Sequence, residues 1–361
     1  MRWKTAFNTE LPIIQAPMAG VQGSRMAIAV SNAGGLGSLP CALLTPEQMR
    51  QELFTMAAQT SFPYNVNFFC HEQPEPDDQT EAKWRALLAP YYVEHGIDAS
   101  GIAAGAGRLP FSQAHCDVLE AFKPPVVSFH FGLPSAPLLA RVRSWGSKVL
   151  ASATTVEEAQ WLEARGVDAV IAQGLEAGGH RGMFLCSELS RQSGTLPLLA
   201  QILAAVKVPV VAAGGIADAR GAAAAMALGA AAVQVGTAYL LCDEALTSPL
   251  HQAALTGPDA RHTALTNLFT GRPARGIMNR AMRELGAINP LAPQFPMATA
   301  AIAPLRQAAE AQGLADFSPL WAGQNTSGCK RMAAAKMTRD LGAGAMAGAR
   351  MGQSLAEQLP A

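Results

Sequence analysis

Short runs of apolar and β-branched residues alternate along the chain with longer segments whose apolar positions follow a helical period. There are eight such runs: PIIQAPMA from 12, GGLGSL from 34, PYNVNFF from 63, VVSFHF from 126, SKVLASA from 147, DAVIAQG from 168, VPVVAAGG from 208 and AAVQVGTA from 231. Segments 155–166 and 216–229 are amphipathic helix candidates between them. This repetition predicts an α/β protein, a (β/α)8 TIM barrel. A doubly wound sheet is the main alternative, but no GxGxxG follows the first run.

Two parts of the chain fall outside this repeat. Residues 71–125 are too long for one crossover, and we expect them to elaborate the third helical region. Residues 246–318 contain helical pieces interrupted by TGPD, GRPARG and NPLAPQFP, without further strand and helix alternation. We therefore predict a barrel at 1–245, a helical C-terminal cap or substrate domain at 246–318, and a segment at 319–361 that returns over the barrel and ends in a helical tail.

Composition narrows the range of partners. The 361 residues are half apolar and carry 27 basic and 27 acidic side chains, so no net charge attracts nucleic acid or an anionic membrane. The six cysteines occur singly, which predicts neither a disulfide framework nor a zinc site. The N-terminal stretch lacks the apolar core of a signal peptide, and polar residues interrupt the Ala-rich stretch 208–241. We expect a cytoplasmic protein with a small-molecule ligand.

In a barrel of this kind the active site lies at the carboxyl ends of the strands. Lys148 and Lys207 precede their strands and belong to the opposite end, so a Schiff-base aldolase is disfavoured. The residues that end or follow the runs are the candidates for the site: Pro17, Met18, Asn67, His130, Gln173, Gly214, Gly215, Gly236 and Thr237.

The loops after the seventh and eighth runs, AAGGIAD and VGTA, have the features of a phosphate site. Barrels frequently bind phosphate at these two loops, on glycine-exposed N–H groups and the start of a short helix. The structural alternative is that the glycines only permit tight turns between strand and helix. Two such turns at the two expected strands favour a phosphate, which in an otherwise apolar site indicates a nucleotide-like cofactor.

Asn67 and Gln173 are amides that can both donate and accept hydrogen bonds. Either alone could be a structural hydrogen bonder. Together at strand ends they favour a heterocycle whose edge alternates carbonyl and N–H groups, as a flavin edge does.

The loop QGLEAGGHRG, residues 173–182, combines Gly174, Gly178 and Gly179 with His180 and Arg181. Its glycines let backbone approach a flat ligand, and a histidine of ordinary pKa suits removal of a proton from a carbon acid. The alternative is a structural role, in which the histidine is only hydrogen-bonded to the barrel rim. We expect Arg181 to hold a carboxylate such as Glu176, and His130 to support the site. A metal site is not expected, because no carboxylate is placed as a third ligand.

Several blocks together resemble one family, nitronate monooxygenase, formerly called 2-nitropropane dioxygenase. These blocks are QAPMAG at 15–20, NVNFF at 65–69, VVSFHFG at 126–132, AQGLEAGGHRG at 172–182, AAGGIAD at 212–218 and QVGTAYL at 234–240. The match extends in order over most of residues 10–325. FTGRPARGIMNR at 269–280 and PLWAGQ at 319–324 also look like family features.

The resemblance implies an FMN-dependent enzyme that oxidises alkyl nitronates with O2 to a carbonyl compound and nitrite. His180 would be the base that deprotonates neutral nitroalkanes, with His130 and Trp321 beside the substrate. Arg272 or Arg275 could meet an anionic substrate, although a structural ion pair is favoured for both. A homodimer is compatible with the resemblance. The cofactor contacts that it implies are Pro17, Met18, Asn67, Gln173, Gly178, Gly179, Gly214, Gly215, Gln234, Val235, Gly236 and Thr237.

Three other functions compete with this one. An NAD(P)H-dependent FMN reductase, for enoyl-acyl-carrier-protein or quinone, would share the GGH and GGI blocks. A non-catalytic FMN-binding protein would need the glycines and amides but no histidine base. A phosphosugar isomerase without flavin would use the phosphate loops alone.

Overall fold

The computed structural model describes residues 2–102 and 108–358. Eight parallel strands form one sheet in the order β1-β9-β8-β6-β5-β4-β3-β2. The two ends of this order, β1 and β2, also meet. Leu36, directly before β2, donates its N–H to Ile13 O at 2.8 Å, and Gln15 N donates to Leu36 O at 3.0 Å. This closes the sheet and confirms the predicted (β/α)8 barrel. The strands are β1 (Ile13–Gln15), β2 (Gly37–Pro40), β3 (Tyr64–Phe69), β4 (Val126–His130), β5 (Lys148–Ala153), β6 (Ala169–Gln173), β8 (Val210–Ala213) and β9 (Ala232–Val235).

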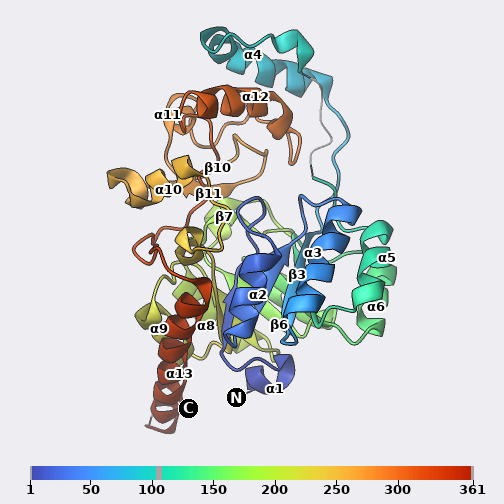
Figure 1. Cartoon of the computed structure of the whole chain (residues 1–361), viewed down its shortest axis with the longest axis vertical. Coiled ribbons are helices and arrows are strands. Elements are labelled where there is room, and N and C mark those ends of the chain that lie inside the picture. Colours follow the sequence, from blue (N-terminus) through green and yellow to red (C-terminus); the bar gives the residue numbers. More distant parts are fainter. Residues whose placement is uncertain (1, 103–107, 359–361) are drawn as a thin grey trace.

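Helices surround the barrel, and the eighth of them comes from the far end of the chain (Figure 1). The predicted C-terminal tail helix is present as α13, which packs against α9, α2 and β1. Thr45, Thr155 and Asp218 cap the N-termini of α3, α7 and α9 with their side-chain oxygens. The barrel helices are α2 (Ser24–Asn32), α3 (Pro46–Gln59), α5 (Gln113–Phe122), α6 (Ala136–Ser144), α7 (Val156–Ala164), α8 (Thr195–Ala205), α9 (Ala219–Ala227) and α13 (Ala334–Gln358).

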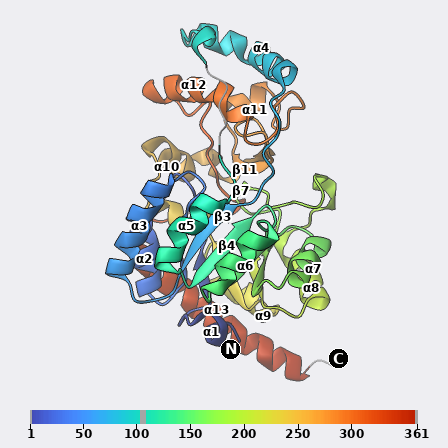
Figure 2. The same cartoon turned by 90° about the vertical axis from the view of Figure 1, so that its right-hand side faces the viewer.

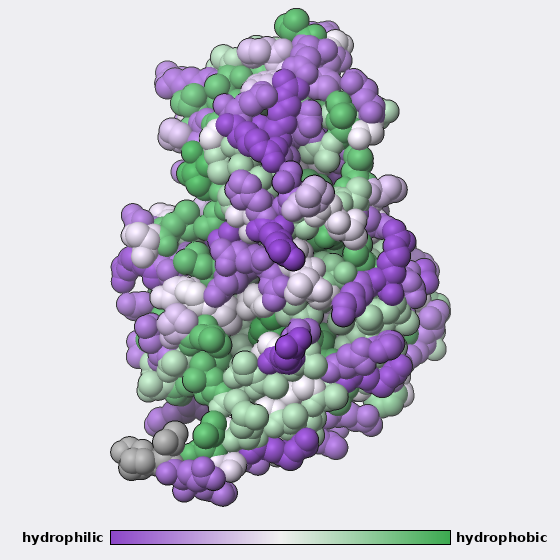
Figure 3. All heavy atoms as spheres, turned by 90° about the vertical axis from the view of Figure 1, so that its left-hand side faces the viewer, coloured by the Kyte–Doolittle hydropathy of each residue, from purple (hydrophilic) through white to green (hydrophobic). Residues whose placement is uncertain are grey.

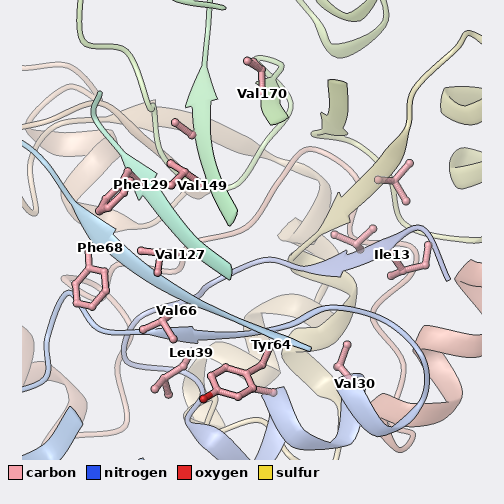
Figure 4. Packing of buried hydrophobic residues seen from close by; sticks show 14 of the residues in the cluster. Ile13, Val30, Leu39, Tyr64, Val66, Phe68, Val127, Phe129, Val149 and Val170 are labelled. Atoms are coloured by element: carbon pink, nitrogen blue, oxygen red, sulfur yellow. The ribbon is translucent and has the colours of Figure 1, made fainter. Parts of the chain in front are cut away.

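Apolar side chains fill two layers of the barrel. The outer layer lies between strands and helices and includes Val66, Phe68 and Val127 (Figure 4). The inner layer is covered at the amino-terminal end of the strands by α1 (Arg2–Phe7) (Figure 2). The Trp3 and Phe7 rings of this helix stack with their centroids 4.0 Å apart. This covering leaves the carboxyl ends of the strands as the open end of the barrel.

A smaller body sits on that open end, and it takes residues from two distant parts of the chain (Figures 1 and 3). The 71–125 region contributes α4, which packs on α12 and places Tyr92 OH 2.7 Å from Ala301 O. Its elements are α4 (Asp78–Glu94), α10 (Pro249–Thr256), β10 (Thr263–Thr266), β11 (Ala274–Ile277), α11 (Arg280–Glu284) and α12 (Ala298–Ala311). Short 3-10 helices follow α4 and α10, namely η1 (Ala99–Gly101) and η4 (Pro258–Arg261), and two more follow β7 and β9, namely η2 (Leu189–Arg191) and η3 (Thr237–Leu241).

The sequence predicted a cap built of helices, but the cap also contains strands. Strands β10 and β11 form an antiparallel hairpin, and β11 pairs with β7 (Gly179–His180) from the barrel loop. These strands read GH, TALT and ARGI, with no continuous apolar run, which explains why the sequence did not reveal them. The pairing of β7 with β11 attaches the loop around His180 to the cap.

Candidate active site

One cavity lies at the carboxyl ends of the strands, with an empty volume of about 1350 Å³ counted out to its open mouth. Residues in or directly after β1, β3, β4, β5, β6, β8 and β9 line it together with the segment that follows the cap. The predicted site residues that line it are Pro17, Met18, Asn67, His130, Gln173, Gly178, Gly179, His180, Gly214, Gly215, Gln234, Gly236, Thr237 and Trp321.

Val235 is the one candidate that does not line the cavity. Successive side chains of a strand point to opposite faces, so Gln234 faces the cavity and Val235 packs in the outer apolar layer, 1% exposed. Only the backbone of Val235 reaches toward the site, where its carbonyl accepts from Ala16 N at 2.8 Å.

Gln173 and Asn67 are both hydrogen-bonded within the protein. Gln173 Nε2 donates to His180 O at 2.9 Å, and its Oε1 accepts from Gly182 N at 2.7 Å. Asn67 Nδ2 donates to Ser128 Oγ at 2.9 Å. Gln173 therefore fixes the shape of the 173–182 loop, and contact of either amide with a heterocycle stays a prediction.

Gln234 differs from these two amides. Its Oε1 is buried and has no hydrogen-bond partner among the described residues. A buried acceptor without a partner costs free energy. The cavity therefore presents one acceptor that is ready for a ligand donor.

His180 is fixed to the cap on several sides. Its Nε2 lies 2.9 Å from Thr270 Oγ1, and its ring centroid is 5.3 Å from that of Phe295 and 5.6 Å from that of Trp321. Burial, then the charges of neighbouring groups, hold its pKa well below the ordinary value. Those groups are Arg108, His130, Arg272 and His71, in decreasing order. The expectation of an ordinary pKa is thus wrong, and His180 is neutral and able to accept a proton at neutral pH.

His130 supports the loop from below. Its Nε2 lies 3.1 Å from His180 O and its Nδ1 lies 2.9 Å from Ser152 Oγ. A carbonyl only accepts, so Nε2 carries the proton and Nδ1 accepts from the Ser152 hydroxyl. Burial lowers the pKa of His130 to about 3, so this neutral form persists at neutral pH.

Arg181 binds different partners from those predicted. It is fully buried and donates to the carbonyls of Gly174 and Gln173, both at 2.7 Å, and to Gln192 Oε1 at 2.7 Å. Glu176, the partner that we expected, instead accepts from Thr195 N at 2.8 Å and Thr195 Oγ1 at 2.7 Å. Side-chain types in the sequence do not indicate which backbone carbonyls will lie nearby in the fold. The predicted partner of Arg181 was therefore wrong.

Arg272 and Arg275 also bond to carbonyls, and the ion pairs expected for them do not form with any described residue. Arg272 donates to the carbonyl of Met183 and lies over the Phe131 ring, 4.0 Å from its centroid. Arg275 Nε donates to Leu175 O at 2.8 Å. Both arginines thus fasten the barrel loop to the cap.

Two glycine loops face the cavity side by side. Gly214 and Gly215 have φ of +128° and +69°, which side chains rarely tolerate. The segment after the cap touches both loops, because Asn325 Nδ2 donates to Gly215 O at 3.1 Å and Gly323 N donates to Thr237 Oγ1 at 2.9 Å. The predicted phosphate loops therefore meet in one pocket, and their role stays a prediction.

Several lining residues were not predicted. Arg108 comes from the long 71–125 region, where no motif marked it, and His251 lies on α10 with Nε2 unpartnered among the described residues. Burial lowers the pKa of His251 to about 4. Ser128 and Ser152 also line the cavity, and each carried a usable signal as a hydroxyl inside an otherwise apolar run.

Over residues 2–102 and 108–358, no three His, Cys, Asp or Glu side chains gather as a metal site. No helix in the same residues is long and apolar enough to cross a membrane.

The barrel, its covered amino-terminal end and the cavity under the cap define a TIM-barrel enzyme that acts on a small molecule. Comparison with known proteins makes the class specific. A family model described as nitronate monooxygenase matches residues 2–341, and the chain belongs to that family. It is therefore an oxidoreductase that acts on nitronates.

Relatives agree over nearly the whole chain. A nitronate monooxygenase of Pseudomonas aeruginosa is 41% identical over 344 residues, 94% of this chain and 97% of that protein. Another, of Paraburkholderia phytofirmans, is 41% identical over 91% of both chains. The crystal structure of a nitroalkane oxidase from Streptomyces ansochromogenes is 40% identical, with a TM-score of 0.86 over 98% of this chain and 99% of that one. FabK from Thermotoga maritima, 24% identical with a TM-score of 0.71 over 99% of both chains, shares the fold.

Proposed function

We propose that the cavity binds FMN and that the enzyme oxidises alkyl nitronates with O2, giving a carbonyl compound and nitrite. The observation that carries this proposal is the convergence of three features in one cavity: two glycine loops, the unpartnered Gln234 Oε1 and the neutral His180. Membership of the nitronate monooxygenase family supports the same reaction.

FMN fits the residues that are present. The glycine loops after β8 and β9 leave backbone amides accessible to a phosphate without a lysine, and this suits an anion at the strand ends of a barrel. Gln234 Oε1 can accept a hydrogen bond from a ring N–H group, which would give this buried acceptor the partner that it lacks among the described residues. When bound, FMN supplies the chemistry that accepts electrons from the nitronate and delivers them to O2. The residues that we propose hold it are Met18, Asn67, Gln173, Gly178, Gly215, Gln234, Gly236 and Thr237, with the backbone of Val235.

For neutral nitroalkanes we propose that His180 removes the proton from the carbon beside the nitro group. The imidazole is neutral at the pH of turnover and is held by Thr270 and by the β7–β11 pairing. A preformed nitronate has already lost that proton and needs no base. Phe69, Phe295 and Trp321 surround His180 with apolar rings that limit the access of water.

The test is to purify the enzyme, record its absorbance spectrum, identify the extracted cofactor and assay ethyl nitronate in air. We expect a yellow protein with FMN, O2 consumption and nitrite release. A colourless protein that does not take up FMN would contradict the proposal. O2 consumption with NADH or NADPH but none with the nitronate would favour a reductase, and FMN without turnover of either substrate would favour a non-catalytic binding protein.

A further inference from the structure

Arg108 stands at the cavity beside the proposed base. It lines the same cavity as His180 and is half-buried. Its guanidinium carbon lies 5.8 Å from the centroid of the Phe295 ring, and that centroid is 5.3 Å from that of the His180 ring. Arg108 is fixed from behind, because its carbonyl oxygen lies 3.0 Å from His71 Nε2.

The guanidinium of Arg108 has no anionic partner among the described residues. Burial and the positive charge of Arg306 both lower its pKa, and no carboxylate opposes them. The undescribed positions 103–107 are alanine and glycine, so they carry no carboxylate either. A partly buried cation without a counter-ion is costly and is usually paired or functional.

The other arginines around this loop are already occupied. Arg181, Arg272 and Arg275 each donate to backbone carbonyls that shape the loop and the hairpin. They are structural donors, whereas the fork of Arg108 is free to meet a ligand in the cavity. A guanidinium fork matches two oxygens on one planar group, the geometry of a nitro or nitronate group.

We propose that Arg108 is a substrate-binding residue that pairs with the two oxygens of the nitronate group. The inference rests on the proposed function. For a neutral nitroalkane, the C–H proton passes to the His180 imidazole, and the C–H electron pair passes onto the nitro oxygens. Arg108 then stabilises the negative charge that develops there, in a cavity where water competes weakly.

This placement also couples Arg108 to the base. Its positive charge is the largest charge effect on His180, ahead of His130, Arg272 and His71, and a positive charge on any of these groups disfavours the imidazolium. Removal of the Arg108 charge therefore raises the pKa of His180. Because only neutral imidazole accepts a proton, the acid limb of the pH profile for a neutral nitroalkane moves to higher pH.

The experiment compares Arg108→Gln and Arg108→Lys with the exposed control Arg350→Gln in holoenzyme. Nitrate, a planar anion that is not oxidised, is titrated by calorimetry, and kcat/KM is measured for ethyl nitronate and for nitroethane across pH. We expect Arg108→Gln to weaken nitrate binding by about tenfold or more. It should raise KM for ethyl nitronate and move the acid limb for nitroethane upward. Arg108→Lys should keep the acid limb near its original pH but bind nitrate less tightly, and the control should change nothing.

Unchanged nitrate binding and an unmoved acid limb in a folded Arg108→Gln enzyme would overturn the inference. If that variant does not fold, Arg108→Lys decides, since nitrate binding equal to wild type there would contradict a forked contact. Failure of the proposed function is separate: it appears as a wild-type enzyme that does not oxidise ethyl nitronate, while nitrate titration still tests Arg108.

Discussion

At the scale of single residues, burial decides the protonation state of His180. An exposed histidine is half protonated near pH 6.5 and serves as base or acid. Here burial and four neighbouring cationic or titratable groups keep the ring neutral. The same environment that disfavours the protonated form of His180 also favours an anion beside it, because Arg108 and Arg272 contribute positive charge. A neutral base next to an anion-attracting pocket suits the conversion of a nitroalkane into a nitronate.

The His180→Asn substitution tests this role. Asparagine preserves a polar side chain of similar size but cannot accept a proton from carbon. We expect FMN content to remain, kcat/KM for nitroethane to fall by about 10² or more, and kcat/KM for ethyl nitronate to fall far less. The exposed His262→Asn is the matched control and should leave both substrates unaffected. An equal loss on both substrates would show that His180 does not transfer the proton.

At the scale of elements, the segment after the cap also packs closely against the 173–182 loop. Gln324 N donates to Glu176 O at 2.9 Å, and Gly323 lies against the backbone of Gly178. A Cβ placed on Gly178 would come within 2.6 Å of Ala322 C and Gly323 N. Gly178 is therefore required by a close approach of two backbones rather than by an unusual φ.

The Gly178→Ala substitution should push this segment away from the barrel. We expect a loss of about 1–3 kcal/mol in the free energy of unfolding, from overpacking, together with weaker FMN binding. Urea unfolding and FMN titration of the apoenzyme measure the two effects. Gly101→Ala is the control, because a Cβ there meets nothing within 4 Å. Equal stability and FMN affinity in Gly178→Ala and wild type would show that the segment does not depend on this contact.

The sequence predicted elements well where their physics is local. Seven of the eight barrel strands fall within the apolar runs, and β2 extends one residue beyond its run, because strands buried on both faces read as continuous hydrophobic segments. The β10–β11 hairpin was missed, because its strands TALT and ARGI interrupt apolar residues with threonine and arginine. The same limit applies to the site. Strand ends gave the lining residues, but the partners of Arg181, Arg272 and Arg275 are backbone carbonyls brought together only by the tertiary fold.

At the scale of the whole molecule, the chain closes its barrel with a helix from its far end. Strand β9 is followed by the cap, and α13 then returns to fill the place between α9 and α2 (Figures 1 and 2). The contact with α9 is close because Gly344, Gly348 and Gly352 of α13 face backbone atoms of Ala219, Ala223 and Ala227. The cap is thereby held between two segments that belong to the barrel.

The Gly348→Ala substitution separates helix propensity from packing. Alanine favours an isolated helix over glycine by about 1 kcal/mol. A Cβ at Gly348, however, would lie 2.1 Å from Ala223 O, so α13 must move away from α9. We expect net destabilisation of about 1–3 kcal/mol in urea unfolding, and Gln353→Ala on the exposed face of α13 should change it by less than about 0.5 kcal/mol. A more stable Gly348→Ala enzyme would contradict this packing.

The proposed reaction requires this cavity to hold FMN and a nitronate in contact. Anaerobic mixing of the holoenzyme with ethyl nitronate, followed by absorbance near the flavin band, measures reduction of the flavin by the nitronate directly. We expect rapid bleaching by the nitronate, return of the yellow colour when O2 is admitted, and no comparable bleaching by NADH or NADPH. Rapid bleaching by a nicotinamide with none by the nitronate would contradict it.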